Sequence, residues 1–224
     1  MFELLAKDQW KIKLSKCTFA QQEISYLGHV ISAQGVSTDP AKVAVVTNWP
    51  IPVTVRELRG FLGLAGYYRK FGKHFGIICR PLTDLLKKNT VFVRTSVHED
   101  SFNALKHALC TAPVLALPNF SKPFSIETDA SGQGVGAVLM QEGHPLAFLS
   151  KALGPKSQGL STYEKEYLAI LMAIQQLRSY LQYNEFIIYT DQKKPHTVDG
   201  TKITHSLAAE SFCQIAWAAV QICI

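Results

Sequence analysis

The sequence has no long apolar run and no paired-cysteine motif. No stretch approaches the roughly 20 consecutive apolar residues that a membrane-spanning helix needs, and no basic leader followed by an apolar segment opens the chain. The cysteines form no C-x-x-C pair and have no histidine spacing suited to zinc; they are Cys17, Cys79, Cys110, Cys213 and Cys223. We therefore expect buried free thiols in a reducing compartment. The protein should be soluble and intracellular, in the cytoplasm or nucleus, neither secreted nor in a membrane.

Internal repeats and low-complexity segments are also absent. Hydrophobic residues make up 47% of the 224 positions, which is enough to bury a core, so a globular chain of one large or two small domains is expected. The first five residues resemble the interior of a helix, which suggests a cut from a longer protein.

The surplus of basic over acidic residues lies in the first half of the chain. Residues 1–120 contain 15 Lys and Arg against 8 Asp and Glu, a net of +7, whereas residues 121–224 contain 8 against 9, a net of −1. Such an asymmetry suggests a polyanionic partner, although a basic surface often serves solubility alone.

The first 110 or so residues predict a β-hairpin and several helices. Alternating apolar and polar residues predict strands within residues 11–19 and 23–32, with a turn at Gly35. Asp39 before Pro40, and Thr54 with its capping-box spacing to Glu57, are helix starts. Helices are therefore expected over residues 40–48, from 54 toward 71, at 81–86 and over 98–111.

From Pro118 onward the pattern is that of an α/β domain. Strands are predicted at residues 123–129, 134–141 and 144–150, a helix at 163–180 and a fourth strand at 185–191, in the order β-β-β-α-β. Residues 193–196 resemble a loop, and the apolar residues 206–224 are consistent with one helix.

Carboxylates gather where these predicted elements end. Asp129 and Asp191 each close an apolar strand, and Glu164 and Glu166 lie in the first turns of the intervening helix. Ligands bind at strand ends in open α/β sheets, and converging carboxylates suit Mg²⁺ or Mn²⁺. Two such ions about 4 Å apart support hydrolysis of a phosphodiester. The alternative is structural, because Asp also forms turns and early acidic residues complement a helix dipole.

Several ordered motifs resemble the Pol polyprotein of gypsy-class LTR retrotransposons. The segments 13–19 (KLSKCTF) and 26–32 (YLGHVIS) are similar to a hairpin that follows the polymerase palm and holds the primer strand. Residues 56–71 (RELRGFLGLAGYYRKF) and 81–86 (PLTDLL) resemble the thumb, and 112–115 (APVL) the link into RNase H. Residues 128–131 (TDAS), 134–139 (GVGAVL), 163–170 (YEKEYLAI) and 189–191 (YTD) resemble the RNase H core.

The resemblance implies an α+β / α/β fold in which a helical, thumb-like N-terminal part with a β-hairpin precedes an incomplete RNase H-like β-β-β-α-β domain. Residues 1–36 would be the end of the reverse-transcriptase palm, and residues 37–117 would form the thumb and connection. Residues 118–192 would form the RNase H-like domain, and residues 193–224 would be a divergent tail.

The resemblance also implies roles for individual residues. Asp129, Glu166 and Asp191 would be catalytic residues that bind Mg²⁺ or Mn²⁺ and hydrolyse RNA within RNA–DNA hybrids. Glu166 is preferred to Glu164 because the family's catalytic acid lies two residues before the sequence Leu-Ala-Ile, as Glu166 does here. Nucleic-acid contacts would come from Arg56, Arg59, Arg69, Lys70, Lys73, Gly28 and His29. Alternatively, the basic residues form a solvated helix face, and Tyr67, Tyr68 and Phe71 pack in the core.

Two departures from the family limit the expected function. The Tyr-x-Asp-Asp motif of the polymerase is absent, so no DNA synthesis is expected. After Gln192 the resemblance ends, and neither a fifth strand nor a fourth acidic ligand is located, although Asp199 and Glu210 are acidic. Such a sheet would keep an unpaired edge. Three hypotheses follow: a hybrid-specific ribonuclease, a catalytically inactive nucleic-acid-binding remnant, or a pseudogene product.

Overall fold

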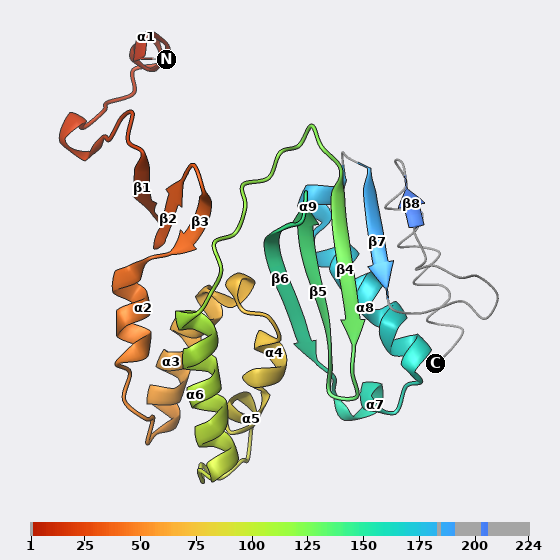
Figure 1. The fold of residues 1–224 in the computed structure, drawn as a ribbon. Coiled ribbons are helices and arrows are strands. Elements are labelled where there is room, and N and C mark those ends of the chain that lie inside the picture. Colours follow the sequence, from red (N-terminus) through yellow and green to blue (C-terminus); the bar gives the residue numbers. More distant parts are fainter. Residues whose placement is uncertain (1, 183–184, 191–202, 206–224) are drawn as a thin grey trace.

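The computed structural model describes residues 2–182, 185–190 and 203–205, which form the mixed α+β fold expected from the sequence (Figure 1). The N-terminal part contains a small antiparallel sheet in the order β1-β2-β3. Leu27 and Gly28 join the first two strands, both with positive φ, as in a two-residue hairpin turn. The elements of this part are α1 (Phe2–Lys7), the 3-10 helix η1 (Leu14–Lys16), β1 (Glu23–Tyr26), β2 (His29–Ser32) and β3 (Gly35–Thr38).

Two expectations for this part were wrong. Residues 11–19 form no strand but contain η1. Their described side chains are largely exposed, so the alternating apolar residues gain no burial that would stabilise a strand. The hairpin expected between residues 11–19 and 23–32 lies within 23–32 instead, as β1 and β2. The turn expected at Gly35 is present at residues 33 and 34, and Gly35 begins a third strand, β3, opposite Ser32. Val36 also exchanges backbone hydrogen bonds with Leu115 of the later chain.

The helices that follow begin where the sequence predicts. The Asp39 side chain accepts a hydrogen bond from the Ala41 amide, and that of Thr54 accepts one from Glu57. The second helix ends four residues before Phe71, because Tyr68 leaves the helical conformation and a separate 3-10 turn follows. The bounds are α2 (Pro40–Thr47), α3 (Val55–Tyr67), η2 (Arg69–Phe71), α4 (Phe75–Ile78), α5 (Arg80–Asp84) and α6 (Ser96–Cys110).

The second part is a five-stranded sheet in the order β6-β5-β4-β7-β8. β4 is central, antiparallel to β5 and parallel to β7. Helix α8 packs against β4 and β5 on one face (Figure 1). The bounds are β4 (Phe124–Ala130), β5 (Gly134–Gln141), β6 (His144–Ala152), α7 (Pro155–Gln158), α8 (Thr162–Gln176), α9 (Arg178–Leu181), β7 (Phe186–Thr190) and β8 (Ile203–His205).

The predicted β-β-β-α-β order is therefore present, and a fifth strand that the sequence analysis did not locate, β8, covers part of the edge of β7 that was expected to be unpaired. β8 pairs antiparallel with β7, matching Phe186 with His205. The strand was missed because three residues are too short for a visible alternation. The loop expected at 193–196 and the helix expected at 206–224 lie outside the described residues.

Each part has its own hydrophobic core. In the first, Phe61, Phe71 and Leu105 are among the buried side chains that join α3, η2 and α6. In the second, Ile126 and Ile170 belong to the core between the sheet and α8. No helix within the described residues is long and apolar enough to cross a membrane.

Candidate metal and nucleic-acid site

Asp129 lies near the carboxyl end of β4, on the face of the sheet turned away from α8. Alternation along the strand buries Phe124, Ile126 and Thr128, and leaves Glu127 and Asp129 exposed. Asp129 pairs with Gly136 of β5, and the preceding Thr128 pairs with Thr190 of β7. Because β4 and β7 are parallel, their carboxyl ends lie at the same edge of the sheet.

Glu166 lies on α8 and is only 6% exposed. Its Oε2 accepts a hydrogen bond from Thr190 Oγ1 at 3.3 Å, which ties the helix to the last residue of β7. A buried carboxylate requires such partners, because burial of an unpaired charge is costly.

Glu164, the other early acid of α8, has a different role. Its Oε2 accepts hydrogen bonds from the Ser161 amide and hydroxyl, both at 2.7 Å, in a capping box. These hydrogen bonds lower the pKa of Glu164, that from the Ser161 side chain most. Glu164 is thus a helix cap, whereas Glu166 faces the strand end.

The third predicted ligand, Asp191, follows Thr190 in sequence and lies outside the described residues. Asp129 and Glu166 offer carboxylate oxygens, the ligand type that Mg²⁺ and Mn²⁺ prefer. Within the described part of the chain, no group of three His, Cys, Asp or Glu side chains is close enough to hold a metal.

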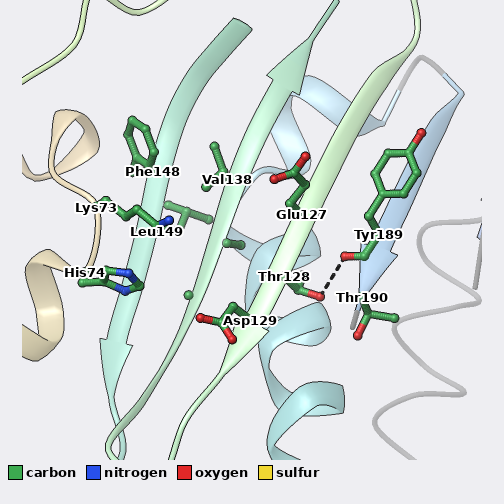
Figure 2. Close-up of a pocket in the computed structure, with 12 residues that line it drawn as sticks. Lys73, His74, Glu127, Thr128, Asp129, Val138, Phe148, Leu149, Tyr189 and Thr190 are labelled. Atoms are coloured by element: carbon green, nitrogen blue, oxygen red, sulfur yellow. Dashed lines mark hydrogen bonds between the residues drawn. The ribbon is translucent and has the colours of Figure 1, made fainter. Parts of the chain in front are cut away.

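A cavity of about 570 Å³ extends over the open face of the sheet beside Asp129. Figure 2 shows Glu127 and Asp129 on the central strand, Tyr189 on one side of them, and Lys73 and His74 on the other. Thr128 Oγ1 donates to the Tyr189 carbonyl at 3.3 Å. Thr190, whose hydroxyl donates to Glu166, also lines the cavity, whereas Glu166 does not.

The predicted nucleic-acid contacts fall into three groups. Arg56 and Arg59 are exposed on α3, as is Arg69 on η2. The half-buried Lys70 holds its Nζ 5.2 Å from the centre of the Phe71 ring, and burial lowers its pKa. Lys73 lies apart from these residues, because it lines the cavity over the open face of the sheet beside Asp129.

Gly28 and His29 are held by the end of α3. Tyr68 Oη donates to the Gly28 carbonyl at 2.7 Å, and Tyr67 Oη donates to Leu27. The His29 ring stacks on Tyr67 at 5.3 Å between centroids, and its Nδ1 is buried without a hydrogen-bond partner among the described residues. Burial, and then the charge of Lys70, lower the pKa of His29.

The core interpretation of the aromatic residues is right for two of three. Tyr68 and Phe71 are 2% and 1% exposed, whereas Tyr67 is 51% exposed and covers His29. The sequence reasoning missed Glu127 and His74 as cavity residues. Strand alternation from Asp129 would have found Glu127, but His74 has no local sequence signal.

Comparison with known proteins agrees with this architecture. Residues 95–188 match the model of the RNase H-like domain found in reverse transcriptase. The Pol polyprotein of transposon 297 from Drosophila melanogaster is 40% identical over 194 residues, covering 86% of this chain and 18% of that protein. That of transposon gypsy, from the same organism, is 37% identical over 196 residues, covering 82% and 19%.

Solved structures give the same fold. The foamy viral protease-reverse transcriptase dRH in complex with ds DNA has a TM-score of 0.81 at 21% identity, covering 98% of this chain and 39% of that one. The foamy viral protease-reverse transcriptase in complex with RNA/DNA hybrid has a TM-score of 0.78 at 21% identity, covering 86% and 27%. At this identity the likeness shows the fold alone.

The second part of the chain is thus an RNase H-like domain of the reverse-transcriptase type. The homologues of the chain are retrovirus-related Pol polyproteins of retrotransposons, gypsy among them, and the chain spans about a fifth of the length of these relatives. Its 224 residues contain no Tyr-x-Asp-Asp motif.

Proposed function

We propose that this chain is a divalent-metal-dependent ribonuclease that hydrolyses the RNA strand of RNA–DNA hybrids. The observation that carries the proposal is the position of Glu166. Its buried carboxylate is hydrogen-bonded to Thr190 at the end of β7, the strand parallel to the one that carries Asp129. Two carboxylates at one sheet edge, with Asp191 next in sequence after Thr190, form the donor set of the proposed site.

When bound to these carboxylates, Mg²⁺ or Mn²⁺ would supply an activated water and stabilise the departing oxygen of the phosphodiester. The chain's own residues would do the rest. Thr190 fixes the Glu166 carboxylate through its hydroxyl, and the antiparallel pairing of Asp129 with Gly136 fixes the backbone that presents Asp129. A rigid ligand frame limits the reorganisation needed when the substrate arrives.

We further propose that the basic residues of the first part bind the phosphates of the hybrid. Arg56, Arg59 and Arg69 are exposed, and no ion pair is observed for them among the described residues. Phosphate contacts of this kind give binding that depends on salt and little on sequence. The foamy viral enzyme bound to an RNA/DNA hybrid, which shares the fold, is consistent with this partner.

The experiment is hydrolysis of a hybrid labelled separately on its RNA and DNA strands, with Mg²⁺ or Mn²⁺, by the wild type and by Asp129→Asn. We expect metal-dependent cutting of the RNA strand alone, reduced by about 100-fold or more in the variant. Equal cutting by both proteins would contradict the assignment. Salt-sensitive hybrid binding without any cutting would instead support the second candidate, a catalytically inactive nucleic-acid-binding remnant, which the exposed arginines also favour.

A further inference from the structure

The open-face cavity has two chemically different ends. Glu127 and Asp129 project from β4, whereas Lys73 and His74 come from the segment between η2 and α4 in the other part of the chain (Figure 2). Among the described residues no ion pair is observed for any of these four side chains. Two cationic or hydrogen-bonding groups therefore face two acids across the cavity without neutralising them.

The segment that carries Lys73 and His74 is anchored on both sides. Phe71 and Phe75 are buried in the first core. The Gly76 amide donates to Ser150 Oγ of β6 at 2.6 Å, and a Cβ at Gly76 would lie 2.7 Å from the Ser150 carbonyl oxygen. No side chain larger than hydrogen fits there without movement, so the segment lies directly on the strand backbone.

A second close approach fixes the same junction. A Cβ at Gly134 of β5 would lie 2.6 Å from Cγ1 of Ile77. Between these anchors His74 adopts φ 58° and ψ 17°, a left-handed conformation that is uncommon for residues other than Gly, although His, Asn and Asp adopt it more often than the rest. Such conformations persist where the surroundings determine them, and they concentrate at functional sites.

The charges decide where a polyanion can enter. Without a metal, the carboxylates of Glu127 and Asp129 repel a phosphate, whereas the ammonium group of Lys73 attracts one. An extended nucleic-acid strand places successive phosphates several ångströms apart, so one phosphate at Lys73 leaves a neighbouring one for the acidic end. Tyr189, which is 46% exposed at the far side, offers an aromatic surface for a base or ribose.

We propose that this cavity is a composite nucleic-acid groove. In it, Lys73 and His74 hold a backbone phosphate of the strand whose next phosphodiester is presented to Asp129, and Glu127 repels polyanions that enter without metal. Lys73 thereby acts at the RNase H-like sheet and not with the arginines of α3. The presentation to Asp129 rests on the proposed function, but the phosphate contact does not.

The test is binding of a fluorescein-labelled RNA–DNA hybrid to the full chain, by anisotropy in EDTA across a salt series. Lys73→Gln should raise the Kd about tenfold at low salt and reduce the slope of log K against log salt by about 1. The matched control is Lys88→Gln, the same charge change at an exposed residue that does not line the cavity; it should leave the Kd unchanged. His74→Asn, which tolerates the left-handed backbone, should weaken binding less than Lys73→Gln.

Glu127→Gln locates the contact. Removal of its charge should tighten metal-free binding by roughly threefold, and less so in the Lys73→Gln background, since the two side chains would face one bound strand. Absence of hybrid binding by the wild type, or equal effects of Lys73→Gln and Lys88→Gln, would overturn the proposal. The proposal would also be overturned if Lys73→Gln raised the Kd by the same factor with and without Glu127→Gln, because Lys73 would then act with the arginines of the α3 surface.

The readout is made without metal, so it is separate from hydrolysis. A chain that shows these effects but cuts no RNA would contradict the proposed function and leave the groove intact. If the wild type cuts RNA but Lys73→Gln and Lys88→Gln bind the hybrid equally well, the proposed function is supported and the groove is contradicted. Thermal unfolding followed by circular dichroism confirms that each variant is folded, as expected because Lys73 and Glu127 are exposed.

Discussion

Gly76→Ala should weaken the contact between α4 and β6 that joins the two parts of the chain. The new Cβ would meet three backbone atoms of β6, the Ser150 oxygen at 2.7 Å, the Ser150 carbon at 2.9 Å and the Lys151 Cα at 3.2 Å. Backbone cannot rotate away as a side chain can. Overpacking of this kind costs about 1–3 kcal/mol, and weakening of the 2.6 Å hydrogen bond from Gly76 to Ser150 Oγ adds about 1 kcal/mol.

A total of about 2–4 kcal/mol corresponds to a fall in Tm of roughly 5–15 °C for a cooperative unit of this size. Gly63→Ala is the matched control, because a Cβ there meets nothing within 4 Å and the residue lies inside α3. It should raise stability by about 0.5–1 kcal/mol through helix propensity. The assay is calorimetry of both variants, with hydrogen exchange of the amides of residues 72–78.

Gly76→Ala should lower the Tm and accelerate exchange in that segment, whereas Gly63→Ala should do neither. If the two variants unfold at the same temperature with the same exchange, the close approach of α4 to β6 is not a stabilising contact. The rigid placement of Lys73 and His74 would then be refuted as well.

Three further predictions concern stability. Tyr68→Phe removes the hydrogen bond to the Gly28 carbonyl and should lower the free energy of unfolding by about 1–2 kcal/mol in urea titrations, with no loss if that carbonyl is hydrated instead. Gln141→Leu removes the amide that binds the Asn119 amide and carbonyl, both at 2.8 Å, and the Lys122 carbonyl at 3.0 Å, and should cost about 2–4 kcal/mol; a calorimetric change below the error would contradict this. Burial and Lys70 lower the pKa of His29 below its ordinary 6.5. On acidification the unfolded state therefore binds a proton before the folded state does, and the free energy of unfolding falls as the pH drops below 6.5. His29→Gln should flatten this dependence between pH 7 and 5, and an unchanged slope would refute it.

The sequence predicted the second sheet well because its strands alternate between a buried face and an open one. Ile126 and Leu139 lie fully buried beneath α8, as the apolar positions of their strands require. The same pattern failed at residues 11–19, with which no strand in the described part of the chain pairs. Alternation predicts a strand only if the tertiary fold supplies a partner and a core.

The candidate site shows the same division. Asp129 and Glu166 were found from local position and family motif, and the roles given to them stay predictions. His74 reaches the cavity only through the docking of α4 on β6, which depends on Gly76 and Gly134. The periodicity of apolar residues within a helix or strand cannot predict such long-range contacts. β8 was likewise invisible, because its pairing with β7 and not its three-residue sequence defines it.

Glu166 and Glu164 lie two residues apart on one helix and allow the most direct test of the proposed site. The measurement is the rate of RNA hydrolysis in an RNA–DNA hybrid with Mg²⁺ for Glu166→Gln and Glu164→Gln. Gln keeps the capping box at residue 164, so that variant should retain the wild-type rate, while Glu166→Gln should lose about 100-fold or more. Equal rates in the two variants, or a loss confined to Glu164→Gln, would contradict the assignment of Glu166 to the catalytic site.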